Sequence, residues 1–184
     1  VDTIGNLAGS GSRSTNLGYI VADDGDVVIT INDAGGGSVV NAADFSAVGG
    51  GTTGTVTVTN AVPISGTQVQ VTAALVTAGS LVVAATSAVT ISDTSGTLLA
   101  TALSAIGGKT SGNVTTSSGI AISGTESQVT AALVTAGTKV VLGAATNVTV
   151  SDASTGANLS NILGVTNVGD CEIRGTCTIA VSTT

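Results

Sequence analysis

The chain has 184 residues and a net charge of −7, with 4 Lys and Arg against 11 Asp and Glu, no His and 1% aromatic residues. It lacks the basic stripe that nucleic-acid phosphates require, and without His it has neither a Ser-His-Asp triad nor a His-ligated metal. Thr, Ser and Gly interrupt every apolar stretch before it reaches about 18 residues, so we expect neither nucleic-acid binding nor membrane insertion.

The first segment, residues 1–30, is rich in Gly, Ser and Asn, and we expect it to form a β-rich N-terminal cap. It holds an acidic cluster of Asp23, Asp24 and Asp26, and Asp33 follows shortly after. Carboxylates around a glycine turn supply the hard oxygen ligands that Ca²⁺ prefers, so these four residues are a candidate calcium site. A polar turn between two strands accounts for the same residues without a metal. The expected cofactor is therefore none, with Ca²⁺ as the alternative.

The middle of the chain repeats itself at a constant offset, the one that separates Ile64 from Ile122. The stretch ISGTQVQVTAALVTAGS from Ile64 and the stretch ISGTESQVTAALVTAGT from Ile122 are identical at fourteen of seventeen positions. FSAVGGGTTGTVTVTN from Phe45 aligns with LSAIGGKTSGNVTTSS from Leu103 at the same offset, and we call this unit the long repeat. From residue 29 to residue 152, short β-like stretches that end in ITIND, PISG, TISD, AISG and TVSD recur about every 30 residues, a period typical of stacked units. The region therefore divides into about five units.

Each copy of the long motif predicts a short helix. Thr67 with Gln70, and Thr125 with Gln128, match the capping box, in which two side chains satisfy exposed backbone N–H groups at a helix start. Val71, Ala74, Leu75 and Ala78 follow at helical spacing, and Gly79 is the expected stop. The β-branched stretches between the helices predict strands at 55–59, 81–91 and 139–150.

A strand, a short helix and a strand in about 29 residues make a compact βαβ step, and such steps join parallel strands. We therefore predict an α/β repeat solenoid with a parallel sheet and β-rich terminal caps. The alternative is an all-β parallel β-helix, and the capping boxes argue against it. The predicted division is an N-terminal cap at 1–30, a solenoid at 31–165 with units near 31–63, 64–90, 91–121, 122–149 and 150–165, and a C-terminal cap or strand at 166–184.

The C-terminal segment carries the two cysteines, Cys171 and Cys177. Their spacing suits a local disulfide across a hairpin, which would place the protein in an oxidising compartment. Two free buried thiols are the alternative. The final stretch CTIAVSTT reads as a strand that either caps the stack or adds to the sheet edge of a neighbouring subunit.

No pattern in the sequence indicates catalysis, so we expect no catalytic residues and a protein that is not an enzyme. The units ISGT-x-x-QVTAALVTAG and LSAIGG-x-T-x-G-x-V resemble the Ala/Val/Thr-rich repeats of very large surface proteins of cyanobacteria and marine bacteria, and similar repeats occur in fibre proteins of phages. The resemblance covers roughly residues 29–169. It implies a structural, self-associating element of an extracellular filament, sheath or cell-surface adhesin. The alternatives are a phage tail-fibre or capsid-decoration protein of the virion, and a glycan- or calcium-binding module.

Overall fold

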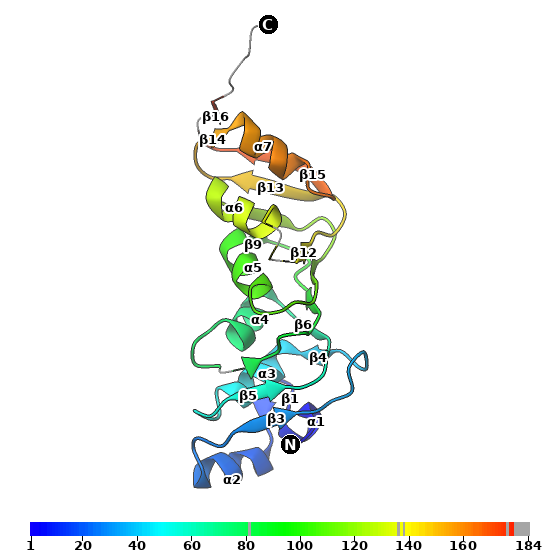
Figure 1. The fold of residues 1–184 in the computed structure, drawn as a ribbon, viewed down its shortest axis with the longest axis vertical. Coiled ribbons are helices and arrows are strands. Elements are labelled where there is room, and N and C mark those ends of the chain that lie inside the picture. The colour runs from blue at the N-terminus through cyan, green and yellow to red at the C-terminus, as the bar shows by residue number, and fades with distance from the viewer. Residues whose placement is uncertain (81, 136, 138, 176, 179–184) are drawn as a thin grey trace, which may run out of the picture.

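The computed structural model describes residues 1–80, 82–135, 137, 139–175 and 177–178. This part of the chain forms an elongated α/β stack of seven helices and parallel sheets, and none of its sheets closes on itself (Figure 1). The predicted α/β class and the parallel strands are confirmed. The helices exclude the all-β alternative.

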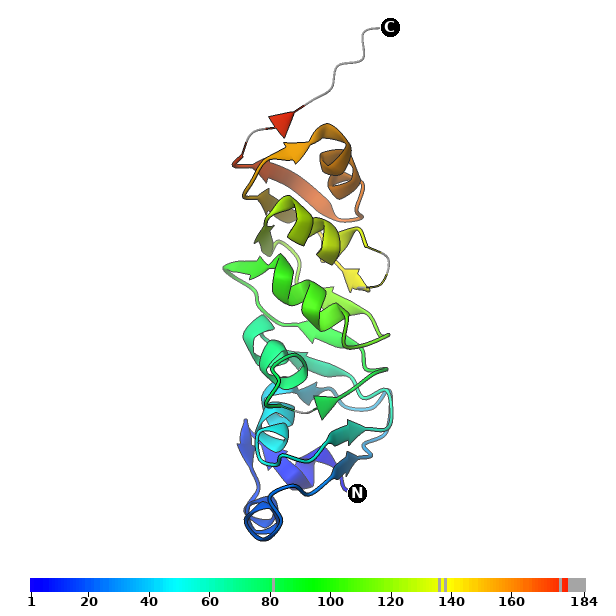
Figure 2. The same cartoon turned by 60° about the vertical axis from the view of Figure 1, so that its left-hand side comes forward.

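The described helices are α1 (Ile4–Leu7), α2 (Thr15–Asp23), α3 (Ala42–Gly49), α4 (Gln68–Leu75), α5 (Ala100–Gly107), α6 (Glu126–Leu133) and α7 (Gly156–Leu163). Every described helix except α5 follows a polar N-cap residue, and α5 follows Leu99. Figure 2 shows α3 to α7 following one another along the long axis of the molecule.

The strands are short, and most of them pair with strands of the neighbouring layers. One sheet is β3 (Ile29–Ile31), β5 (Val56–Val58) and β7 (Val82–Val83). The second is β4 (Val40–Asn41), β6 (Ile64–Gly66), β8 (Val89–Ile91), β10 (Val114–Thr116) and β12 (Val140–Val141). The third is β9 (Thr97–Leu99), β11 (Ala121–Gly124), β13 (Thr146–Val150) and β15 (Val168–Ile173). β14 (Ser154–Thr155) pairs with β16 (Cys177–Thr178), and β1 (Ala8–Gly9) with β2 (Ser12–Arg13) forms an antiparallel hairpin.

We call the chain from one strand to its ladder partner a layer. The strand register shows that a layer contains fewer residues than the period of about 30 residues in the sequence. Ile64, Val89 and Val114 are direct partners in successive strands of the five-stranded sheet. Ile122, the equivalent of Ile64 in the second copy, comes after Val114 in the chain and lies in the four-stranded sheet instead. The long repeat therefore spans more than two layers and does not end on a whole number of them. As a result, equivalent strands of successive repeats belong to different sheets.

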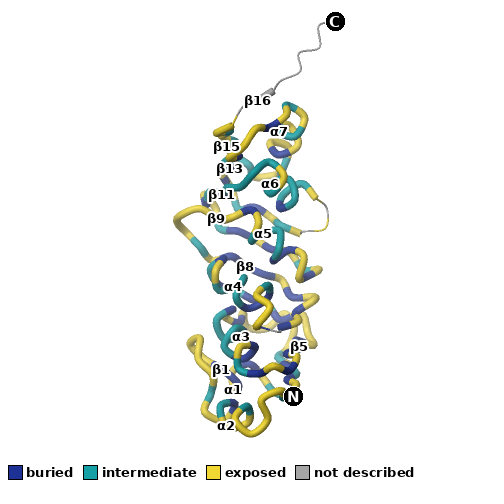
Figure 3. The backbone as a smooth tube through the Cα atoms, turned by 90° about the vertical axis from the view of Figure 1, so that its left-hand side faces the viewer, coloured by how far each residue is buried: buried dark blue, intermediate teal, exposed yellow. Residues whose placement is uncertain are grey.

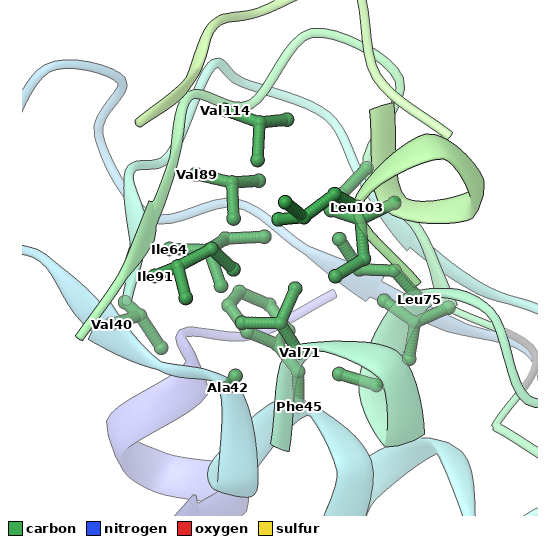
Figure 4. Close-up of a cluster of buried hydrophobic side chains, with 14 of the residues drawn as sticks. Val40, Ala42, Phe45, Ile64, Val71, Leu75, Val89, Ile91, Leu103 and Val114 are labelled. Atoms are coloured by element: carbon green, nitrogen blue, oxygen red, sulfur yellow. The ribbon is translucent and has the colours of Figure 1, made fainter. Parts of the chain in front are cut away.

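The core is a narrow column of aliphatic side chains between the sheets and the helix row. Figure 4 shows Ile64, Val89 and Val114 above one another, with Phe45 and Val71 below them. All five side chains are at most 1% exposed. Fully burying one such side chain contributes about 1.5–3 kcal/mol, so many small contributions replace the aromatic core that this composition lacks. Figure 3 shows the buried positions running along the middle of the stack, with exposed turns at its margins.

The glycine of the ISGT motif permits close packing of successive layers. A Cβ atom on Gly66 would lie 2.9 Å from the Cβ of Ala42, the first residue of α3. A Cβ on Gly124 would lie 2.9 Å from the Cβ of Ala100, the first residue of α5. Carbon atoms attract one another best at about 3.5–4.0 Å, so any larger residue would push the layers apart.

The predicted stop of the first repeat helix at Gly79 is wrong. α4 ends at Leu75, with Val76 as its C-cap. The backbone N–H of Thr77 donates to the carbonyl of Thr72 at 3.0 Å, and the Thr77 hydroxyl donates to the same carbonyl at 3.2 Å. Thr77 thus satisfies a helix-end carbonyl before the chain reaches the glycine.

The expectation of a β-rich N-terminal cap is also wrong, because residues 1–30 contain α1, α2 and only one short hairpin before β3. Ser14 begins α2, since its side chain accepts a hydrogen bond from the N–H of Leu17 at 3.2 Å. Leu17 is the buried residue of this helix and is 1% exposed. The Ser14 cap and the buried Leu17 therefore both favour a helix at this end of the stack.

Candidate functional site

An aspartate joins successive layers at three equivalent places. The carboxylate of Asp93, just after β8, accepts a hydrogen bond from the N–H of Gln68, the first residue of α4, at 2.6 Å. Asp152, just after β13, accepts from the N–H of Glu126 at 2.6 Å, and Asp33, just after β3, accepts from the N–H of Ile4 at 2.7 Å. The acid of each strand end therefore caps a helix of the preceding layer. A charge-assisted bond at the positive end of a helix is stronger than a neutral one.

The third junction identifies residues 2–7 as a shortened repeat segment. Asp2 lies opposite Ile31, as Gly66 lies opposite Ile91, and in both places the carbonyl of the first residue accepts the next N–H of the strand beside it. Thr3 is the N-cap residue of α1, as Thr67 is of α4. Sequence reasoning missed this equivalence. The sequence pattern that indicates it is Asp-Thr-x-x-Asn, which starts at Asp2 and is a weak variant of the Gly-Thr-x-x-Gln pattern that starts at Gly66.

Both expected capping boxes are present. The hydroxyl of Thr67 accepts from the N–H of Gln70 at 3.3 Å, and the Gln70 side chain accepts from the N–H of Thr67 at 2.9 Å. Thr125 and Gln128 repeat these two bonds at the same distances, 3.3 and 2.9 Å. The capping boxes fix the first turns of α4 and α6, whose backbone N–H groups donate to Asp93 and Asp152. They therefore help to form the layer junctions.

One of the three differences between the two copies of the long motif has a structural consequence. Gln68 is 7% exposed, and its side-chain amide both donates to the carbonyl of Leu99 and accepts from its N–H, each at 2.9 Å. The amide thus pairs with the edge of β9 as a neighbouring strand would. The side-chain carboxylate of Glu126, in the second copy, has no N–H to donate and instead accepts from the hydroxyl of Thr130 at 3.2 Å. The protection of this sheet edge is specific to the first copy.

The four candidate calcium ligands are not gathered at one place. Asp23 ends α2, Asp24 is its C-cap, and Asp26 follows in the next turn, whereas Asp33 holds the start of α1. A hydrogen bond with Asp26, together with desolvation and the charges of Asp26 and Asp23, raises the pKa of Asp24. Within the described ranges, no group of three or more His, Cys, Asp or Glu side chains is arranged to hold a metal ion. Calcium binding stays a prediction, and a thermal melt with and without EDTA tests it.

Cys171 is the cysteine whose side chain the structure describes. It lies in β15 opposite Val148, is half-buried and is a free thiol in this structure, and desolvation raises its pKa. The side chain of Cys177 lies outside the described residues. The predicted disulfide therefore stays a prediction.

An apolar groove of about 320 Å³ runs between α4 and α5. Val69, which is 77% exposed, and Leu99, which is 55% exposed, line it together with Ala73 and Ala102. At the equivalent place between α6 and α7, Ser127 replaces Val69. Leu99 and Ala102 are replaced there by Ala157 and Ser160. The groove therefore belongs to the first copy of the motif and is not a general feature of the repeat.

A second apolar pocket, of about 200 Å³, lies at the end of the stack that carries the N-terminus. Its lining combines the start of the chain, α2 and the edge of β3, namely Val1, Asp2, Leu7, Leu17, Ile20, Val27, Val28 and Ile29. Ile20 is 48% exposed and Val28 is 69% exposed, so this part of the stack end is open to solvent. The pocket has no counterpart among the candidate sites that the sequence suggested.

Comparisons with known proteins find no matching protein-family model, no matching curated protein and no matching solved structure. None of the helices that the structure describes has both the length and the apolar character needed to cross a membrane.

Proposed function

We propose that this chain is a repeat solenoid that acts as a structural, non-catalytic spacer in an extracellular filament, sheath or surface adhesin, and that it associates with itself. The observation that carries the proposal is the threefold use of one layer junction, with Asp33, Asp93 and Asp152 each capping a helix of the layer before. A protein built by repeating one junction gains length with each added unit.

The surface chemistry supports the same role. Of its residues 8% are charged, and its commonest residues are Ala, Val, Thr, Ser and Gly. Its repeats resemble those of large bacterial surface proteins and of phage fibres, in which a stiff extended element is the common requirement. The virion role is the alternative, and it uses the same physical properties.

The spacer function is tested by adding length. Inserting a second copy of residues 42–99 after Leu99 adds one complete long repeat and preserves every repeat boundary. With about 2.3 layers in the insert and about 4.8 Å between neighbouring strands, the particle should lengthen by about 11 Å per insert. Small-angle X-ray scattering of variants with one and two inserts measures this increment, and circular dichroism checks that helix content rises in step.

The matched control is an insert of the same amino acids in shuffled order. The shuffled insert should scatter as a flexible segment and should add no helix. A second shuffled insert should not lengthen the particle by the same amount as the first. Equal length increments for the ordered and shuffled inserts would contradict the solenoid. Negative-stain microscopy of the purified chain addresses the filament separately, and particles that remain single at all concentrations would contradict self-association.

A further inference from the structure

The apolar groove between α4 and α5 has large side chains at one end and small ones farther along. Val69 and Ala73 are four residues apart on α4, so they lie on one face of that helix, about one turn from each other. Leu99, the N-cap residue of α5, and Ala102, in its first turn, line the other side. Val69 is 77% exposed and Leu99 is 55% exposed, whereas the two alanines leave space in the groove of about 320 Å³. One patch therefore carries both protruding apolar side chains and a hollow lined by small ones.

Such a patch is complementary to itself about a two-fold axis. In an isologous contact, residue i of one copy meets residue j of the other, and residue j of the first meets residue i of the second. Thr72 lies between Val69 and Ala73 in the chain and also lines the groove. An axis near Thr72 therefore places the Val69 end of each groove over the Ala73 hollow of the other copy.

The charge distribution favours this groove as the meeting surface of two copies. The chain has a net charge of −7, so two copies repel each other on average. Asp93 is the only charged residue of the sequence between Asp44 and Lys109, and its carboxylate accepts the N–H of Gln68. None of the residues that line the groove is charged. Because residues near a two-fold axis meet their own copies, an uncharged patch avoids the like-charge repulsion that a charged one would suffer there.

Thr72 supplies a polar group that can pair with its own copy. Within the described part of the chain, the buried hydroxyl of Thr72 has no hydrogen-bond partner. Its counterpart Thr130 donates to the carboxylate of Glu126 at 3.2 Å, whereas Gln68, in the place of Glu126, is bonded to Leu99. Threonine adopts two rotamers in helices, and a turn from one to the other moves the hydroxyl out of its buried position. A hydroxyl both donates and accepts, so the Thr72 side chains of two copies can bond to each other.

We propose that two copies of this chain associate through the α4–α5 groove about a two-fold axis, with Val69 of each copy in the hollow of the other and the two Thr72 side chains facing each other at the axis. The occupant is a second copy because the patch supplies both halves of the contact. This inference rests on the proposed self-association and names its surface. Ser127 replaces Val69 on α6, so the second copy of the motif does not repeat the surface.

The first test exchanges one residue between the two copies of the motif. Val69→Ser introduces the residue that the chain itself has at position 127, so the helix should still form, and a circular dichroism melt checks this. Sedimentation velocity over a range of concentrations should show association weakened about 10- to 100-fold, because the dimer loses the burial of two valine side chains. Association that Val69→Ser leaves unchanged would overturn the proposal.

The matched control makes the same change at an exposed valine outside the groove. Val39 lies just before β4 and is 60% exposed. Val39→Ser should change association by about twofold or less, because an exposed side chain outside the contact loses no burial there. Equal weakening by Val39→Ser and Val69→Ser would mean that the copies associate through general apolar attraction, and would overturn the proposed surface.

A pair of charged variants tests the two-fold axis itself. Thr72→Lys and Thr72→Glu each place two like charges at the axis, so each variant alone should associate about tenfold or more weakly than the unmodified chain. An equimolar mixture sets opposite charges against each other and should associate about tenfold or more tightly than either variant alone, with a gain that falls as salt is added.

A mixture that associates no better than its components would overturn the two-fold arrangement, because α4 would then contact a different surface. These outcomes are separate from the insertion test of the spacer function. A chain that lengthens with each insert and still associates fully as Val69→Ser would retain the proposed function and lose only this surface.

Discussion

Replacing Gly66 with Ala should destabilise the stack, since the new Cβ atom would lie 2.9 Å from the Cβ of Ala42 and 3.1 Å from the side-chain oxygen of Gln70. The Ala42 methyl group cannot rotate away, because a Cβ atom is fixed by its backbone, and Ala42 is 0% exposed. The two layers must therefore separate locally by several tenths of an ångström. Overpacking of this kind costs about 1–3 kcal/mol. For a chain of this size, that corresponds to a fall in Tm of about 3 to 10 °C.

Thermal and urea melts followed by circular dichroism measure the effect, and Gly79→Ala is the matched control. A Cβ on Gly79 would meet nothing within 4 Å, so this variant should be unchanged or up to about 1 kcal/mol more stable. The double variant Ala42→Gly, Gly66→Ala removes the closest contact and should recover part of the loss, as a double-mutant cycle would reveal. The packing argument fails if the Gly66→Ala and Gly79→Ala variants have the same Tm. It also fails if the double variant Ala42→Gly, Gly66→Ala is no more stable than Gly66→Ala alone.

Three further predictions address the junction, the sheet edge and the cysteines. Asp93→Ala should lower stability by about 1–2 kcal/mol in urea melts, the usual cost of a lost helix cap, while Asp93→Asn keeps an acceptor and should lose less; equal losses would argue against the cap. Gln68→Glu removes the donor to the β9 backbone and should cost about 1–3 kcal/mol at neutral pH, whereas the reverse change Glu126→Gln should be close to neutral, and a matching loss in both would contradict the edge role of Gln68. In the reduced protein, burial raises the pKa of Cys171, so its alkylation by iodoacetamide should stay slow until the pH exceeds that of an ordinary thiol. A non-reducing digest should yield a peptide linked through Cys171 and Cys177, and two separate alkylated thiols would contradict the disulfide.

The sequence allowed the local features of this fold to be predicted because their signals lie within a few residues of one another. Thr67 and Gln70 belong to a single helical turn, which brings them together, so the capping box can be recognised without any tertiary information. The bond from Ile4 to Asp33 spans 29 residues and depends on the register of the strand that Asp33 follows. The alternation of buried and exposed side chains shows which face of a strand is buried, but it does not show which residue of a strand one layer away is the partner.

The number of residues in a layer was overestimated for a related reason. The period of about 30 residues is the distance between strand ends of two different kinds, those that end in Asp (ITIND, TISD and TVSD) and those that end in Gly (PISG and AISG). The ladders pair each strand with its spatial neighbour, and the step from Ile64 to Val89 is shorter than the motif period. The remaining residues of the long repeat are used to shift the strands from one sheet to the next. A shift of this kind leaves no mark in composition or in hydrophobic pattern.

The shifted strands have a mechanical consequence. β7 ends the three-stranded sheet, and the chain continues directly into β8, in the middle of the five-stranded sheet. β12 ends that sheet and leads into β13, an inner strand of the four-stranded one. The layer in which one sheet ends is therefore a layer in which the next sheet continues through an inner strand. No single plane across the described stack cuts every hydrogen-bond ladder at its end, so a force along the axis meets intact ladders at each level.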